Sequence, residues 1–152
     1  MAANRVYFVQ HGLAVDKAED SERPLSKAGV QQTKKMAEAL RDSKVPISSI
    51  FHSGKLRALQ TAEIFASTLS TSPSSTIEGL SPNDDVTLLA QKLGTNEALY
   101  IGHLPCLEKL VAYLVTGNEN GSITTFKNSA VVCLEKHDAH YQLQWHLTPE
   151  LL

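Results

Sequence analysis

The sequence has little cysteine and no long apolar run. Of its 152 residues only Cys106 and Cys133 are cysteines, and their separation does not match the short paired spacing of a metal site. No motif for thiol chemistry surrounds either one, so we expect both to be buried as small apolar side chains in a reducing compartment. No apolar stretch approaches the roughly 20 residues of a membrane-spanning helix, and the first residues lack the apolar core of a secretion signal. We therefore expect a cytoplasmic protein.

An excess of charge of either sign is also missing. Lysine and arginine together number 14 and aspartate and glutamate 16, which gives a formal net charge of −2. No global field therefore draws the chain to nucleic acid or to a membrane, and we expect neither as a partner. Any anion that binds must be held by a local cluster of donors. With 42% hydrophobic and 20% charged residues, the composition predicts one domain over residues 1–152 that folds without disulfides or metals.

Short apolar runs alternate with longer amphipathic segments along the chain. The apolar runs predict strands at residues 6–9, 48–52, 76–78, 98–101, 129–134 and 141–146. The amphipathic segments predict helices at residues 26–43, 55–69, 83–93 and 105–116. This alternation favours a three-layer α/β/α sandwich with a mostly parallel central sheet, whose last two strands form an antiparallel pair at one edge.

Two histidines follow predicted buried strands at their carboxyl ends, where open α/β sheets bind ligands. His11 comes after the first strand and His103 after the fourth. Arg57 lies in the first turn of a predicted helix, where backbone N–H groups favour an anion. With Arg23 as a second guanidinium, these side chains predict a phosphoryl-transfer site. A neutral imidazole is a nucleophile near pH 7, and a guanidinium matches phosphate oxygens. Gly12 permits a tight turn after the strand and leaves its N–H free to point inward.

Four separated segments of this chain together resemble the histidine phosphatase superfamily, also called phosphoglycerate mutase-like, and within it the short SixA-type phosphohistidine phosphatases. The resemblance extends over nearly the whole chain, including the closing segment at residues 145–149. The matching motif residues are Gln10-His11-Gly12, Arg23-Pro24, Ser53, Arg57-Ala58, Gln60-Thr61-Ala62, Gly102-His103 and Pro105.

The resemblance implies a role for each residue of the predicted site. His11 would be the phosphorylated nucleophile, and Arg57, Arg23 and His103 would surround the phosphoryl group, with Gly12 in the substrate-binding turn. No metal or organic cofactor would be needed. The substrate would be a phosphohistidine in a protein, such as a histidine-kinase phosphotransfer domain. Separately from the resemblance, we expect a monomer.

The chain departs from the family pattern directly before the nucleophile, where arginine is usual and this sequence has Gln10. A hydrogen bond to a charged group contributes about 1.5–3 kcal/mol, against about 0.5–1.5 kcal/mol for a neutral pair. The Gln10 amide can donate to phosphate, but it adds no positive charge. We therefore expect weaker phosphate binding or slower turnover than in an arginine-bearing relative. Gly54 and Leu104 are smaller departures, which affect loop shape.

Several alternatives stay open from the sequence. The chain could be a small-molecule phosphomonoesterase, or a non-catalytic phosphate or phosphoprotein binder in which Gln10 signals lost chemistry. Glu78 is the best candidate for a general acid, and a plain surface carboxylate is an equal interpretation of it. His137 and His140 could suggest a metal, but a polar turn between the last two strands is the preferred interpretation.

Overall fold

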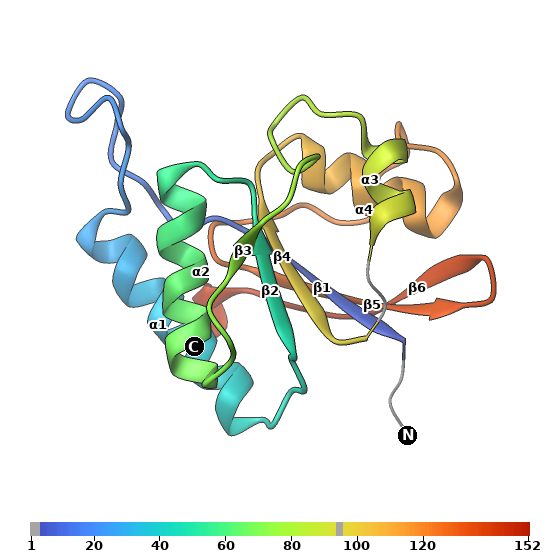
Figure 1. Cartoon of the computed structure of the whole chain (residues 1–152), viewed down its shortest axis with the longest axis horizontal. Coiled ribbons are helices and arrows are strands. Elements are labelled where there is room, and N and C mark those ends of the chain that lie inside the picture. Colours follow the sequence, from blue (N-terminus) through green and yellow to red (C-terminus); the bar gives the residue numbers. More distant parts are fainter. Residues whose placement is uncertain (1–3, 94–95) are drawn as a thin grey trace.

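Six strands form one sheet in the order β3-β2-β4-β1-β5-β6 (Figure 1). The structure, a computed structural model, describes residues 4–93 and 96–152. β1 to β4 are parallel, while β5 is antiparallel to both β1 and β6, so the predicted mostly parallel sheet with an antiparallel edge pair is confirmed. The strands are β1 (Arg5–Gln10), β2 (Ser49–His52), β3 (Ser75–Thr76), β4 (Ala98–Gly102), β5 (Val131–His137) and β6 (His140–Leu147).

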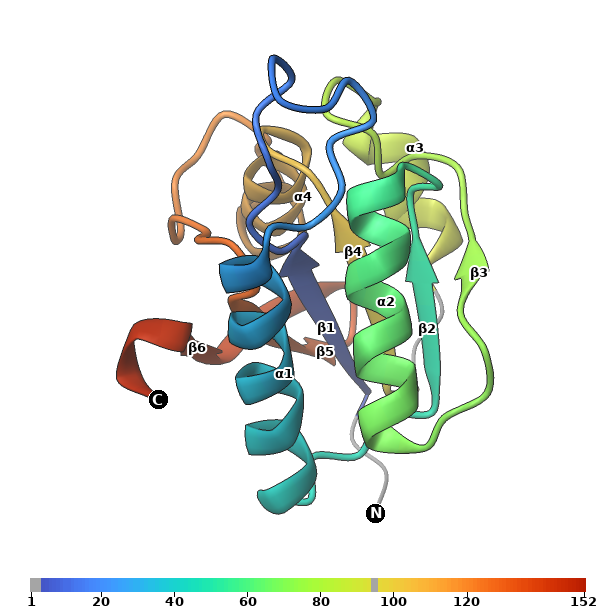
Figure 2. The same cartoon turned by 90° about the vertical axis from the view of Figure 1, so that its left-hand side faces the viewer.

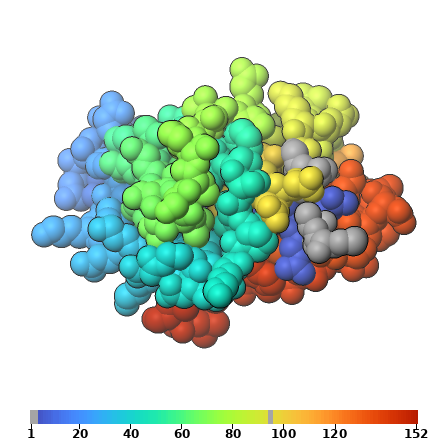
Figure 3. Space-filling view, turned by 60° about the horizontal axis from the view of Figure 1, so that its bottom comes forward, coloured from blue at the N-terminus to red at the C-terminus, as the bar shows by residue number. Residues whose placement is uncertain are grey.

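Helices cover both faces of the sheet and complete the predicted three layers. α1 and α2 lie side by side on one face, and α3 and α4 cover the other (Figures 1 and 2). A short 3-10 turn, η1, contacts α1, and the dark red C-terminal residues lie beside the cyan segment of α1 in Figure 3. The helices are α1 (Lys27–Asp42), α2 (Leu56–Leu69), α3 (Val86–Lys92), α4 (Cys106–Thr116) and η1 (Pro149–Leu151).

The central strands are buried on both faces, as their continuous apolar sequence predicts. Successive side chains of a strand point to opposite faces, so Tyr7 and Val9 pack against α1 and α2. Val6 and Phe8 pack against the layer of α3 and α4. Burial on both faces fixes the register of β1, and it thereby fixes where the chain leaves the sheet.

Helix ends follow the predicted capping residues. Ser26 is the N-cap of α1, and its hydroxyl accepts a hydrogen bond of 3.0 Å from the Gly29 N–H. Asp85 caps α3 in the same way, and Gly117 ends α4 with a left-handed φ of 81°. Helix α2 begins at Leu56, one residue after the predicted start.

The predicted third strand at residues 76–78 is wrong in its bounds. β3 is Ser75–Thr76, paired with Phe51 and His52 of β2. The Ile77 N–H still donates to the His52 carbonyl, and the chain then turns away from the sheet. Glu78 therefore lies in the loop between β3 and α3.

The parallel strands end at one edge of the sheet, and the register sets which residues meet there. Gln10 pairs with Gly102, and His52 pairs with Ile101. The residues that follow β1, β2 and β4 therefore leave the sheet as neighbours. Figure 2 shows the arrows of β1, β2 and β4 pointing to this edge, with the blue loop at residues 11–26 arching over it.

The burial of the cysteines and the position of the last turn are as expected. Cys106 and Cys133 are fully buried, and burial raises the pKa of Cys106 to about 12 and that of Cys133 to about 11. Asp138 and Ala139 form the turn of the β5–β6 hairpin, with His137 and His140 in the strands on either side. Within residues 4–93 and 96–152, no helix is long and apolar enough to cross a membrane.

Candidate active site

The backbone of His11 is held on both sides at the end of β1. Its N–H donates a hydrogen bond of 3.1 Å to the Gly102 carbonyl, which continues the ladder to β4 for one residue. Its carbonyl accepts a hydrogen bond of 3.0 Å from the Asn128 amide. The side chain is 9% exposed, so the ring meets solvent through a small area only. This packing presents the imidazole in one fixed orientation.

The hydrogen bonds of the His11 ring determine its tautomer. Nδ1 lies 2.7 Å from the Gly12 carbonyl oxygen, which can only accept, so the proton of the neutral ring is on Nδ1. Nε2 then has a free lone pair, and the Arg57 Nε–H donates to it over 3.3 Å. The ring nitrogen with nucleophilic character therefore lies directly beside a guanidinium.

His103 follows β4 and lies next to His11. The two ring centroids are 5.0 Å apart, with the planes at 48° to each other. His103 is 1% exposed, and its Nε2 lies 2.7 Å from the Ser53 hydroxyl. Its Nδ1 is buried and has no hydrogen-bond partner within the part of the chain that the structure describes.

The charges that act on both imidazoles are positive. Burial lowers the pKa of His11 to about 4; the Gly12 carbonyl opposes this shift, and the charges of Arg57 and Arg23 add to it. Burial lowers the pKa of His103 to about 3, and the further lowering comes from His11, Arg57, Lys55 and Arg23. Both rings are therefore neutral near pH 7 in a positive environment. Such a site favours a bound anion.

Arg57 and Arg23 approach the site from different elements. Arg57 is in the first turn of α2, and burial followed by the charge of Arg23 lowers its pKa. Arg23 lies in the loop at residues 11–26, with a left-handed φ of 50° and an Nε–H that donates to the Val15 carbonyl at 3.0 Å. The Leu25 N–H donates to Gln60 Oε1 at 2.7 Å, which ties this loop to α2. The two guanidiniums are thus held near the same pair of histidines.

Comparison with known proteins agrees with this arrangement. A family model described as the histidine phosphatase superfamily (branch 1) matches residues 6–81. The phosphohistidine phosphatase SixA of Escherichia coli (strain K12) is 33% identical, over 95% of this chain and 94% of that protein. The chain belongs to the histidine phosphatase superfamily. It is therefore a phosphatase, and the resemblance inferred from its motifs is confirmed.

Two further relatives span the same length. An uncharacterised protein of Picosynechococcus sp. is 30% identical, over 96% of this chain and 92% of that protein. The solved structure of the protein histidine phosphatase SixA complexed with tungstate aligns with a TM-score of 0.86 at 31% identity, covering 97% of this chain and 98% of that one. The predicted α/β sandwich of the phosphoglycerate mutase-like type is thereby confirmed.

The Gly12 N–H of this histidine phosphatase has a different role from the predicted one, which was to point freely into the site. This N–H is not free, because it donates to Thr61 Oγ1 at 2.9 Å, and that hydroxyl in turn donates to the Arg57 carbonyl at 2.8 Å. A Cβ at this position would lie 2.6 Å from Thr33 Oγ1. Glycine is therefore required here for a close approach of backbone to side chains, and the N–H links the turn after His11 to helix α2.

Within the described part of the chain, no side-chain hydrogen bond joins Gln10 to the other residues of the phosphatase site. Its backbone carbonyl accepts from the Ser129 N–H at 2.9 Å, and its side-chain Oε1 is buried with no partner among the described residues. The contact expected between its amide and phosphate therefore stays a prediction. Lys55 adds a positive charge that acts on His103 and lowers its pKa.

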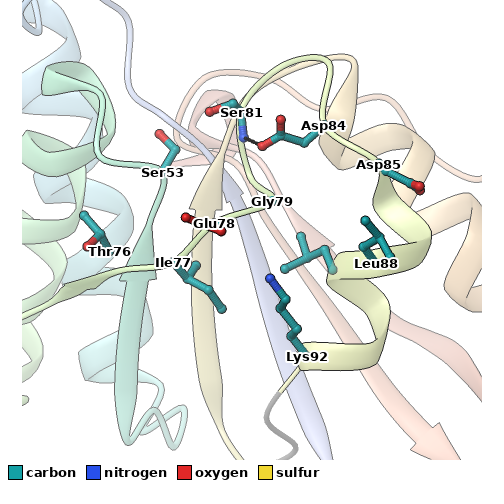
Figure 4. A pocket seen from close by; sticks show the side chains of 11 residues that line it. Ser53, Thr76, Ile77, Glu78, Gly79, Ser81, Asp84, Asp85, Leu88 and Lys92 are labelled. Carbon is teal, nitrogen blue, oxygen red and sulfur yellow. Dashed lines mark hydrogen bonds between the residues drawn. The ribbon is translucent and has the colours of Figure 1, made fainter.

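A pocket of about 470 Å³ adjoins the site at Ser53 (Figure 4). Glu78, the predicted candidate for a general acid, is in its wall, and no hydrogen bond among the described residues joins it to His103. Asp84 is committed to the Ser81 N–H and Asp85 to the cap of α3. The lining residues are Ser53, Thr76, Ile77, Glu78, Gly79, Ser81, Asp84, Asp85, Leu88, Leu89 and Lys92.

Three residues that contact the predicted site were assigned no role from the sequence. Ser53 and Thr61 lie inside the matched motif, so the sequence marked them as candidate site residues. The motif does not indicate that they form hydrogen bonds with His103 and Gly12. Asn128 lies in the long loop before β5, and no local pattern marks it. It reaches His11 because β5 pairs with β1.

Proposed function

We propose that this enzyme removes the phosphoryl group from a phosphohistidine in a protein, through a covalent intermediate on His11. The observation on which this proposal depends is the lone pair of His11 Nε2 beside the Arg57 guanidinium, in a site where the acting charges are positive. The similarity to SixA of Escherichia coli, named a phosphohistidine phosphatase, supports this substrate class. A histidine-kinase phosphotransfer domain is the kind of partner that presents such a group.

The first step would be in-line attack of His11 Nε2 on phosphorus, with cleavage of the bond between phosphorus and the substrate nitrogen. The electron pair of that bond leaves on the substrate imidazole, which takes a proton from solvent. Phospho-His11 would be cationic, and the Gly12 carbonyl would stabilise the charge by accepting from Nδ1–H over 2.7 Å. Arg57 and Arg23 would hold the phosphoryl oxygens, with His103 and the Gln10 amide as further donors.

The second step would return the enzyme to its starting state. Water attacks the phosphorus of phospho-His11, the bond to Nε2 breaks, and inorganic phosphate leaves. Nε2 regains its lone pair beside Arg57. The site residues thus need no metal and no organic cofactor for either step.

The leaving group favours a phosphohistidine over an alkyl phosphate. An imidazole has a conjugate-acid pKa of about 6.5 and can depart protonated, whereas an alkoxide needs a placed acid. Among the pocket carboxylates, Asp84 accepts from the Ser81 N–H and Asp85 from the Thr87 N–H at the start of α3, and no hydrogen bond within the described part of the chain joins Glu78 to His11 or His103. The two buried thiols support a reducing, cytoplasmic location, and we propose that the enzyme acts there as a monomer.

A labelled phosphodonor tests the proposal. The wild-type chain should take up acid-labile label that maps to His11, and His11→Asn should take up none. A phosphorylated phosphotransfer domain should be dephosphorylated with a kcat/KM well above that for an alkyl phosphate. The pocket that contains Glu78 favours a second candidate function, that of a small-molecule phosphomonoesterase. A higher kcat/KM for the alkyl phosphate than for the phosphotransfer domain would establish this second function.

A further inference from the structure

The turn at residues 53–55, between β2 and α2, separates two contacts of the catalytic histidines. Ser53 directly follows β2 (Figure 4), and its Oγ lies 2.7 Å from His103 Nε2. Arg57 lies in the first turn of α2, and its Nε donates to His11 Nε2 over 3.3 Å. A change in the conformation of this turn would therefore move both contacts at once.

The middle residue of the turn, Gly54, is held by a side chain of the preceding strand. Its φ is 95°, in the region that glycine adopts readily and other residues rarely. Glycine also has more backbone freedom to lose than any other residue, so a turn around it keeps one conformation best when its N–H is bonded. The Gly54 N–H donates a hydrogen bond of 3.1 Å to Nδ1 of His52. This hydrogen bond ties the turn to the end of β2.

The His52 ring is a fixed acceptor for this hydrogen bond. A backbone N–H can only donate, so Nδ1 has the lone pair and the proton of the neutral ring is on Nε2. His52 is 4% exposed, and burial lowers its pKa against the opposing charge of Glu63, so the ring is neutral near pH 7. Its backbone is paired with Thr76 of β3 and Ile101 of β4, and strands therefore hold it on both sides.

We propose that His52 is a positioning residue of the phosphatase site, whose Nδ1 holds the Gly54 N–H and so fixes the turn between Ser53 and Arg57. His52 acts only through this turn, and no bond to its ring forms or breaks during the reaction. The 2.7 Å contact between Ser53 and His103 depends on the turn whichever of the two side chains donates. The role of His52 goes beyond the function proposed above, because the turn would act in the same way on any phosphoryl group held at the site.

The test compares variants of His52 that keep or lose the acceptor, with kcat and KM measured on p-nitrophenyl phosphate. His52→Asn keeps an acceptor, because Oδ1 of asparagine and Nδ1 of histidine are both bonded to Cγ, whereas His52→Leu and His52→Val have none. The apolar variants should lose about tenfold in kcat with KM within about threefold of wild type, since small displacements affect the reacting geometry most. His52→Asn should keep kcat within about threefold. His146→Leu is the matched control and should do the same, because His146 is in β6 and its Nδ1 contacts Thr124 Oγ1 at 2.7 Å.

Amide hydrogen exchange separates the turn from the rest of the fold. The Gly54 N–H should exchange slowly in wild type and His52→Asn and rapidly in the apolar variants. Two apolar variants are compared, at a temperature where circular dichroism shows the folded state, so that poor folding of one does not prevent the comparison. Equal kcat in His52→Asn and the apolar variants, or an apolar loss no larger than that of the control, would overturn the role of His52. Labelling of His11 is scored separately and decides only the proposed function.

Discussion

Arg57 Nε donates to Nε2 of His11 over 3.3 Å, so the guanidinium occupies the side of the ring from which phosphorus must be attacked. The contact cannot persist in a phosphorylated enzyme, because Nε2 would then be bonded to phosphorus. Arg57 is well placed to move its hydrogen bond from Nε2 to a phosphoryl oxygen as the anion enters. The same residue thus keeps the nucleophile unprotonated before binding and neutralises charge after it.

The lowered pKa of His11 predicts how folding stability depends on pH. Burial lowers the pKa of His11 to about 4, while an unfolded histidine titrates near 6.5. Between these values the unfolded chain binds a proton that the folded chain does not, so the free energy of unfolding falls as the pH is lowered from about 6.5 to 4. Urea unfolding of the anion-free enzyme at pH 7.0, 5.5 and 4.5 should show this slope, and His11→Asn should make it shallower. Equal slopes for the two proteins would contradict the prediction.

Replacement of Gln10 by arginine should strengthen the site for anions. The Gln10 carboxamide oxygen is buried without a partner among the described residues, so the substitution breaks no hydrogen bond of that oxygen. A guanidinium would add a charge-assisted hydrogen bond in place of a neutral one, a difference of about 1 kcal/mol, or roughly fivefold in phosphate affinity. The dissociation constant of inorganic phosphate and the kcat on phosphohistidine measure the effect. Gln10→Lys should give a smaller gain, since an ammonium cannot bind two oxygens as a fork.

The sheet and its functional edge could be predicted because both depend on local pattern. The apolar run before Gln10 has the composition of a strand buried on both faces, and parallel strands end at one edge whatever their loops contain. His11 and His103 were therefore placed correctly as neighbours from the sequence. The bounds of β3 were not predicted correctly, because a two-residue strand is determined by its pairing with β2 and not by its own side chains.

The hydrogen bonds that orient the site could not be predicted, because each joins residues far apart in the chain. Ser53 and His103 are 50 residues apart, and Gly12 and Thr61 are 49 apart. The motifs contain these residues but do not indicate which of them form hydrogen bonds with each other. The N–H of Gly12 was expected to be free for this reason, and only the packing of the loop at residues 11–26 against α2 shows that it is used.

Gly12→Ala should destabilise the fold and disturb the turn after the nucleophile. The added methyl group would lie 2.6 Å from Thr33 Oγ1, and that hydroxyl is fixed by hydrogen bonds of 2.7 Å to both the Gly29 carbonyl and Ser129 Oγ. Overpacking of this kind costs about 1–3 kcal/mol. Thermal or urea unfolding measures the loss. Thr33→Ala in the same chain should restore part of it, and a double variant less stable than Gly12→Ala would refute the clash as the cause.

Asn128→Ala should lower activity more than its loss of stability explains. The Asn128 amide donates to the His11 carbonyl over 3.0 Å, which holds the nucleophile from a loop 117 residues away. Removal of one such hydrogen bond costs about 1 kcal/mol of folding free energy. It also loosens the turn that orients the His11 ring, so we expect kcat to fall about tenfold while KM changes little. Asn128→Asp should behave in the same way, because it keeps the shape and lacks the donor. Asn118→Ala is the matched control and should keep wild-type kcat. The Asn118 side chain accepts from the Asn120 N–H in an exposed part of the same loop. A kcat for Asn128→Ala equal to that of the control would show that the hydrogen bond serves the fold alone.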